Sequence, residues 1–113
     1  MATVTLHRPE RRNALSWALV GEIRSAVAEL RDDDVRVVVV TGSCTKAFCA
    51  GADLEGMGGA DPEGAADRHE GRGRLAALFQ DLWDLGKPTI AKVRGFALAG
   101  GMGLALSCDL VIA

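Results

Sequence analysis

Two bends built from small residues could hold a reacting oxygen atom through backbone groups alone. The first spans residues 48–54, the second spans residues 95–103, and each comes after an apolar run. Because small side chains leave the backbone open, its N–H groups can approach a bound molecule closely. Two N–H groups from separate bends could stabilise a carbonyl oxygen that becomes negatively charged during a reaction. The sequence therefore points first to chemistry that backbone donors support.

Other residue types that often do chemistry give weaker signals. His7 and His69 lack neighbours at metal-binding spacing, so we interpret both as surface residues. The three cysteines are an odd number without a CxxC pair, which indicates neither a disulfide framework nor a zinc site. We expect Cys44, Cys49 and Cys108 to be small buried residues in a reducing compartment. The sequence predicts no metal centre.

A motif without the right context, the net charge and the lengths of the uncharged stretches argue against several classes of partner. Residues 71–76 fit the dinucleotide pattern GxGxxA, but no strand precedes them, so we interpret the match as chance. The net charge is −2 and no long basic run occurs, so we expect no binding to nucleic acid. The longest uncharged stretch, residues 95–108, is shorter than the ~20 residues that span a bilayer. No secretory signal opens the chain, and we predict a cytoplasmic location.

The first half of the chain predicts a strand, a helix and a second strand. Residues 2–6 have strand character, and Ser16 is a predicted helix N-cap. Residues 35–41 are nearly all apolar, which is typical of a strand in a parallel sheet covered by helices. Between them, apolar residues recur at the spacing of a helix: Trp17, Val20, Ile23, Val27 and Leu30.

The second half predicts the same alternation. After a loop at residues 55–66, a core-facing helix is predicted from Leu75, Leu78, Phe79, Leu82 and Trp83. A strand at 89–93, a short helix ending at Leu106 and a strand at 109–113 follow. If both bends follow strands of one sheet, they meet at its carboxyl edge. Because the chain stops inside an apolar strand, we expect a fragment of a longer domain.

Six motifs occur along the chain in a recognisable order and spacing. They are VTLHRP at 4–9, NAL at 13–15, VVVVTG at 37–42, AFCAGADL at 47–54, KPTIA at 87–91 and GFALAGG at 95–101. Together they resemble the crotonase superfamily, which is the enoyl-CoA hydratase/isomerase family. The resemblance implies an α/β fold of the crotonase-like ββα superhelix type, here incomplete and truncated at both ends. Residues 1–113 would form a partial acyl-CoA-binding domain of a protein that assembles into trimers or pairs of trimers.

The resemblance also implies roles for particular residues. The family stabilises the enolate of a thioester, and the two oxyanion donors would be the N–H groups of Ala52 and Gly100. Arg12 matches a basic position that meets the coenzyme phosphates, although a solvated loop arginine is an equal alternative. No tightly bound cofactor is implied, since coenzyme A arrives as part of the substrate. The loop that holds its adenine end through backbone atoms would consist of Ala50, Gly51, Ala52, Asp53 and Leu54.

One position departs from the hydratases of this family. They carry a glutamate three residues after the second oxyanion glycine, and here that position is Gly103. Because hydration of a double bond needs a positioned acid and base, ordinary hydratase turnover is not expected. Asp53 is assigned to the bend itself, while Glu55 and Asp61 could supply a carboxylate and nothing favours either. The family implies a lyase or isomerase of fatty acid metabolism. A non-catalytic acyl-CoA binder and an inactive truncated fragment remain alternatives.

Overall fold

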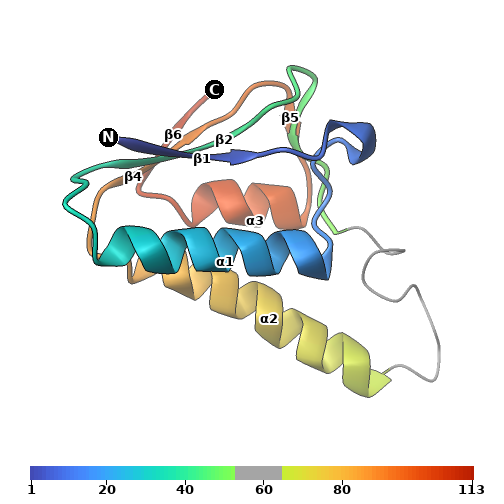
Figure 1. Ribbon diagram of the computed structural model, residues 1–113. Coiled ribbons are helices and arrows are strands. Elements are labelled where there is room, and N and C mark those ends of the chain that lie inside the picture. Colours follow the sequence, from blue (N-terminus) through green and yellow to red (C-terminus); the bar gives the residue numbers. More distant parts are fainter. Residues whose placement is uncertain (53–64) are drawn as a thin grey trace.

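The computed structural model describes residues 1–52 and 65–113, with side chains from residue 72 onward in the second part. Figure 1 shows how the strands and helices of the described residues are arranged. They are β1 (Ala2–Leu6), the 3-10 turn η1 (Pro9–Arg11), α1 (Trp17–Arg31), β2 (Val38–Gly42), β3 (Ala47–Cys49), α2 (Ala65–Trp83), β4 (Thr89–Lys92), β5 (Phe96–Ala97), α3 (Gly100–Leu106) and β6 (Leu110–Ile112).

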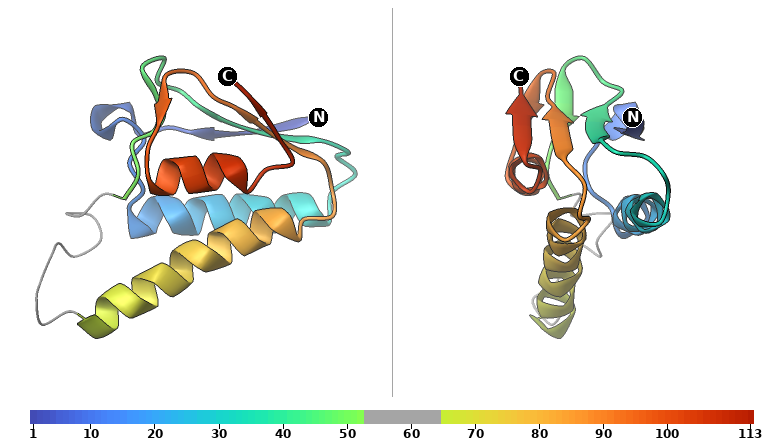
Figure 2. Two further views of the ribbon diagram at one scale, coloured as in Figure 1. Left: turned by 180° about the vertical axis from the view of Figure 1, so that it is seen from behind. Right: turned by 90° about the vertical axis from the view of Figure 1, so that its left-hand side faces the viewer.

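A four-stranded parallel sheet forms one layer of the molecule. Its strand order is β1-β2-β4-β6, and Val40 of β2 is in register with Val4 of β1 and with Ala91 of β4. Figures 1 and 2 show α1 and α3 beneath this sheet and α2 below them. The prediction of an α/β fold with a parallel sheet is confirmed.

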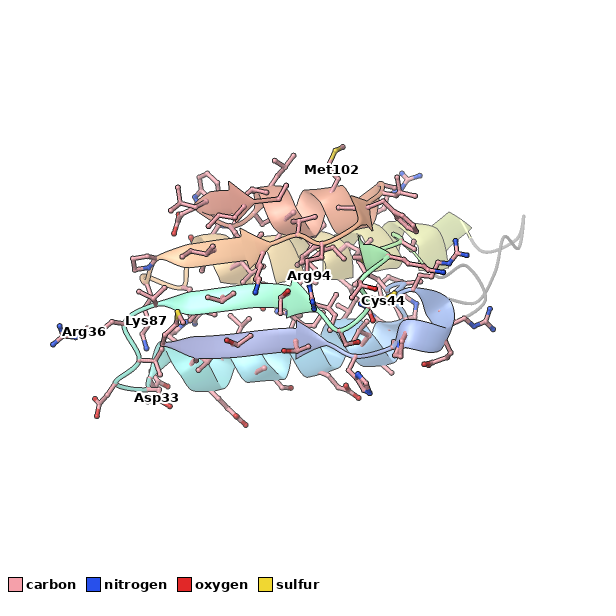
Figure 3. All side chains as sticks on the ribbon, turned by 90° about the horizontal axis from the view of Figure 1, so that it is seen from above. Asp33, Arg36, Cys44, Lys87, Arg94 and Met102 are labelled. Carbon is pink, nitrogen blue, oxygen red and sulfur yellow. The ribbon has the colours of Figure 1, made fainter. Side chains whose placement is uncertain are left out.

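Only one face of the sheet is covered by the helices that the structure describes. Along β2, buried Val38 and Val40 alternate with half-buried Val39 and Thr41. Figure 3 looks onto the opposite face, where Arg94 and Cys44 lie near the ends of β4 and β2. The expected helical cover is therefore present on one side of the sheet. This explains why burial alternates along β2, although its residues are nearly all apolar.

Helix α1 begins as the sequence predicts. The Oγ atom of Ser16 accepts a hydrogen bond from the N–H of Leu19 at 3.1 Å, so the N-cap is confirmed. The helix is tied to α2 by the ion pair between Arg24 and Asp81, whose Nε and Oδ2 atoms are 2.7 Å apart. At its other end, the Lys87 ammonium donates to the carbonyl oxygens of Leu30 and Asp33.

The core is mainly aliphatic and joins all three helices to the sheet. Its fully buried members include Phe48 as the largest side chain. The cluster comprises Leu6, Leu15, Leu19, Val20, Ile23, Val27, Val38, Val40, Phe48, Cys49, Leu78, Leu82, Leu85, Ala91, Leu104, Ala105 and Cys108.

Three details of the prediction are wrong. Strand β2 begins at Val38 instead of Val35, because its ladder with β1 starts at the pair Ala2 and Val38. Helix α2 already includes residues 65 and 66, while the rest of the predicted loop lies outside the described residues. Trp83 is 73% exposed, because it follows the buried Leu82 by one residue and therefore points about 100° away from the core-facing side of α2.

Candidate functional site

The two bends leave from a second, smaller sheet. Strands β3 and β5 pair in parallel, with Ala47 opposite Phe96 and Cys49 opposite Ala97. The prediction that both bends directly follow the apolar runs as strands of one sheet is therefore wrong, because β3 and β5 overlap the start of each bend and form a separate sheet. The expected consequence still holds, because neighbouring parallel strands release both bends at the same edge.

The predicted oxyanion donors lie close together in space. A Cβ atom built on Gly100 would be 3.9 Å from the nitrogen of Ala52 and 3.5 Å from Cδ1 of Leu15. Within the described ranges, neither the Ala52 N–H nor the Gly100 N–H donates to a backbone or side-chain acceptor. Ala52 is exposed and Gly100 half-buried. Two segments that are distant in the chain thus lie close together at an accessible place, and neither amide has a hydrogen-bond partner among the described residues.

Helix α3 packs against β3 through a glycine. A Cβ atom on Gly101 would lie only 2.3 Å from the carbonyl oxygen of Cys49 and 2.8 Å from its Cβ atom. The N–H of Leu98 also donates to that carbonyl oxygen at 3.1 Å. This close approach brings the start of α3 next to the first bend.

The first bend is also held from the other side by residues 12–15. The N–H of Leu15 donates to the carbonyl oxygen of Gly51 at 2.7 Å, and the N–H of Ala50 donates to that of Arg12 at 3.1 Å. Three non-glycine residues among the described ones have positive φ, namely Arg12, Asn13 and Ala99. All three flank the bends, where a strained backbone is held in place by its surroundings.

Asn13 is a buried residue whose individual role the sequence did not reveal. Its side chain is fully buried; Nδ2 donates to the Phe48 carbonyl oxygen at 3.2 Å, and Oδ1 accepts from the Arg8 N–H at 2.7 Å. The amide therefore fixes the loop at residues 8–15 against β3. An asparagine in a polar loop has no distinguishing pattern, so only its place in the NAL motif could have marked it.

Asn13→Ala is expected to destabilise the chain by about 2–4 kcal/mol, because two buried backbone groups lose their partners and alanine disfavours the positive φ. Asn13→Gly loses the same hydrogen bonds but tolerates a φ of 58°, so we expect it to be less destabilising by about 1 kcal/mol. Urea unfolding measures both values. Equal stability of Asn13→Ala and wild type would show that the amide does not brace the bend.

The structure brings most of the predicted binding residues together. Arg12 is exposed, and its guanidinium carbon lies 5.9 Å from the centre of the Phe96 ring, next to Ala50. Arg12, Ala50, Gly51, Ala52 and Gly100 thus share one edge of the molecule. The remaining predicted residues lie outside the described part of the chain: Asp53, Leu54, Glu55 and Asp61.

Two of the cysteines are protected by burial. Burial raises the pKa of the Cys49 thiol, and it raises the pKa of the Cys108 thiol to about 11 from an ordinary value of 9.0. Cys44 is half-buried. No group of three histidine, cysteine or acidic residues that could hold a metal ion occurs among the residues described.

Cys108 is expected to make stability fall at high pH. Because folding raises the thiol pKa, the folded state holds the proton more tightly than the unfolded state. This contribution is complete below pH 9.0 and is lost as the pH rises to about 11. The free energy of unfolding of Cys108→Ala should therefore fall less steeply over this range than that of wild type in urea titrations. Parallel pH profiles for the two proteins would contradict the assignment.

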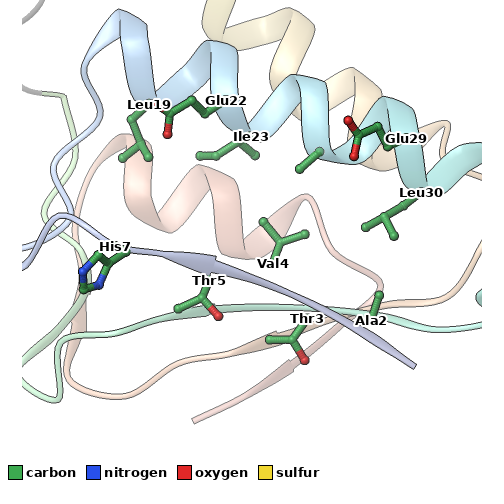
Figure 4. A pocket seen from close by; sticks show the side chains of 11 residues that line it. Ala2, Thr3, Val4, Thr5, His7, Leu19, Glu22, Ile23, Glu29 and Leu30 are labelled. Atoms are coloured by element: carbon green, nitrogen blue, oxygen red, sulfur yellow. The ribbon is translucent and has the colours of Figure 1, made fainter.

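A separate groove lies between β1 and α1, as the close view in Figure 4 shows. Its volume is about 420 Å³, and its lining includes His7, Glu22 and Glu29. None of the bend residues that the structure describes contributes to it. The groove is therefore distinct from the place where the Ala52 and Gly100 amides meet.

Comparison with known proteins identifies the family of this chain. The model of the enoyl-CoA hydratase/isomerase family matches residues 1–113. The chain belongs to this family. A mitochondrial protein of Dictyostelium discoideum named as a probable enoyl-CoA hydratase is 45% identical over 111 residues, covering 97% of this chain and 38% of that protein.

Solved structures of the enoyl-CoA hydratase/isomerase family share the fold. An enoyl-CoA hydratase from Bacillus anthracis superposes with a TM-score of 0.88 at 34% identity, covering 96% of this chain and 42% of that one. One from Mycobacterium smegmatis gives 0.88 at 37% identity, covering 96% and 42%. The chain thus spans less than half the length of these relatives. None of the helices described is both long and apolar enough to cross a membrane.

Proposed function

We propose that the protein binds an acyl-CoA thioester and stabilises its enolate between the N–H groups of Ala52 and Gly100. The observation that carries this proposal is the closeness of these two amides, since a Cβ on Gly100 would be only 3.9 Å from the Ala52 nitrogen. Among the described residues, neither amide has a hydrogen-bond partner. A thioester oxygen placed between them would receive two hydrogen bonds. Removing one such donor typically costs an enzyme about 3–4 kcal/mol of transition-state stabilisation.

The coenzyme part of the substrate would lie along the first bend. Ala50, Gly51 and Ala52 offer backbone groups, and the exposed Arg12 beside them could pair with a phosphate. Asp53 and Leu54 would continue this loop. No tightly bound cofactor is needed, since coenzyme A enters and leaves with the acyl group.

The relatives named as enoyl-CoA hydratases make a hydratase or isomerase reaction the first activity to test. Gly103 supplies no acid or base, so hydration would require carboxylates elsewhere in the full-length protein. The glycine at position 103 favours a second candidate, which is a protein that binds the thioester without transferring protons. An inactive fragment is the third, since the chain covers 38% of the Dictyostelium relative. We further propose a homotrimer or hexamer and a cytoplasmic location for the full-length protein.

A chromophoric thioester tests the central claim. Cinnamoyl-CoA absorbs at longer wavelength when its carbonyl oxygen accepts strong hydrogen bonds, so binding to the full-length protein should shift its spectrum to the red. Binding without a shift would contradict the two-amide site. A parallel assay of crotonyl-CoA hydration separates the candidates, because a shift without turnover favours the non-catalytic binder.

A further inference from the structure

The ring of Phe79 fills the space next to Gly103. A Cβ atom on Gly103 would lie 3.0 Å from Cζ and 3.1 Å from Cε2 of this ring. Contacts this short are tighter than nine in ten real Cβ contacts, so a side chain at position 103 would push the ring by a few tenths of an ångström. The Phe79 ring on α2 therefore packs closely against the backbone of Gly103 on α3.

This contact lies one helical turn from the proposed oxyanion donors. Gly103 follows Gly100 by three residues in α3, and residues at this spacing lie on the same face of a helix. Leu15 approaches Gly100 on the same side, at 3.5 Å from its built Cβ atom. Phe79 is half-buried. Apolar groups thus stand beside the meeting point of the two amides.

We propose that Phe79 contacts the acyl group of the bound thioester and, paired with Gly103, makes this side of the site apolar. The inference rests on the proposed function, since it places the thioester oxygen at Ala52 and Gly100. The acyl carbon next to that oxygen then lies within reach of the first turn of α3. Phe79 is accordingly a specificity-determining residue that selects an apolar acyl group.

Binding measurements on the full-length protein test the acyl contact. The dissociation constants of butyryl-CoA and of free coenzyme A are compared by calorimetry for wild type, Phe79→Ala and Leu75→Ala. Leu75 is the matched control, because it is also half-buried on α2 but lies one turn away. Phe79→Ala should weaken butyryl-CoA binding about tenfold, as the loss of part of an apolar contact implies. Binding of free coenzyme A should change less than about twofold, and Leu75→Ala should preserve the ratio of the two constants.

The outcomes separate this inference from the function on which it rests. Wild-type protein that binds butyryl-CoA no better than coenzyme A would overturn both. If wild type prefers butyryl-CoA over coenzyme A and Phe79→Ala keeps this preference, only the role of Phe79 is overturned. The same holds if Leu75→Ala loses the preference as much as Phe79→Ala does.

A second measurement needs no ligand. Gly103→Ala should lower the melting temperature in the wild-type background, where the new Cβ meets the ring. In the Phe79→Ala background it should raise the melting temperature, because alanine favours helix more than glycine does. If Gly103→Ala changes the melting temperature equally in both backgrounds, the Phe79 ring does not restrict the side chain at position 103.

Discussion

Gly95→Ala is expected to destabilise the fold by more than about 3 kcal/mol, a large part of the 5–15 kcal/mol that holds a typical domain together. A Cβ atom there would lie 2.1 Å from the carbonyl carbon and oxygen of Lys46 and 2.6 Å from the nitrogen of Ala47. These are backbone atoms at the start of β3, so relief requires the small sheet to separate. The residue also has a φ of 74°, which alanine disfavours. Urea unfolding of the variant and wild type gives the difference.

Gly86→Ala is the matched control for this prediction. Its φ of 77° is nearly the same, but a Cβ atom there would meet nothing within 4 Å. It should cost only about 1–2 kcal/mol, from backbone strain alone. The difference between the two variants measures the collision with Lys46. Equal losses would mean that β3 and β5 can separate without cost at this point.

Gly100→Ala is expected to fold normally and lose function. The added Cβ would be 3.5 Å from Leu15 and 3.9 Å from the Ala52 nitrogen, both ordinary contact distances. It would nevertheless stand where the thioester oxygen must approach the two amides. If this blocks one hydrogen bond, turnover of the full-length protein should fall about 10²–10³-fold. The spectral shift of bound cinnamoyl-CoA should shrink in parallel, which gives a readout even if the protein does not catalyse hydration.

Gly21→Ala controls for the general effect of adding a methyl group to a helix. Gly21 is exposed on α1, and nothing lies within 4 Å of its built Cβ atom. This variant should keep full activity and gain about 1 kcal/mol of stability. A Gly100→Ala protein that matches Gly21→Ala in activity would place the reacting oxygen somewhere else.

Long periodic segments were predictable from the sequence because their burial pattern repeats many times. The N-cap at Ser16 and the apolar stripe of α1 from Val20 to Val27 are examples, and both are confirmed. The strand at Val38–Gly42 was recognisable from its composition, although its first residue was not. That residue depends on where β1 begins to pair, which local sequence does not encode.

Short elements and chain positions beyond a periodic pattern could not be predicted. Strand β3 has 3 residues and β5 has 2, too few for an alternation to appear. Their pairing depends on the close approach of Gly95 to Lys46, which is a long-range contact. Trp83 continues the apolar run of its neighbours, but it lies about 100° around α2 from the buried Leu82 and therefore faces solvent. Apolar character alone does not distinguish a helix residue that faces the core from one that faces solvent.

For the candidate site, several residues that the family motifs single out lie close together in the fold, while their roles stay a prediction. Ala52 and Gly100 meet, and Arg12 lies beside Ala50. What the motifs could not supply is the support around them. The buried amide of Asn13 and the ring of Phe79 contact backbone that is distant in sequence. No local sequence pattern encodes such contacts.

The connectivity of the parallel sheet has a consequence for folding kinetics. No neighbouring strands of its order β1-β2-β4-β6 are joined by a tight hairpin, and a helix lies between each pair along the chain. Such high contact order makes folding slow, since long loops must close before the pairings stabilise them. Helix α2 and strand β4 lie between Ala52 and Gly100 in the chain, so these two residues come together only after this long loop has closed. In refolding from urea, thioester recognition should therefore reappear later than far-ultraviolet helical signal.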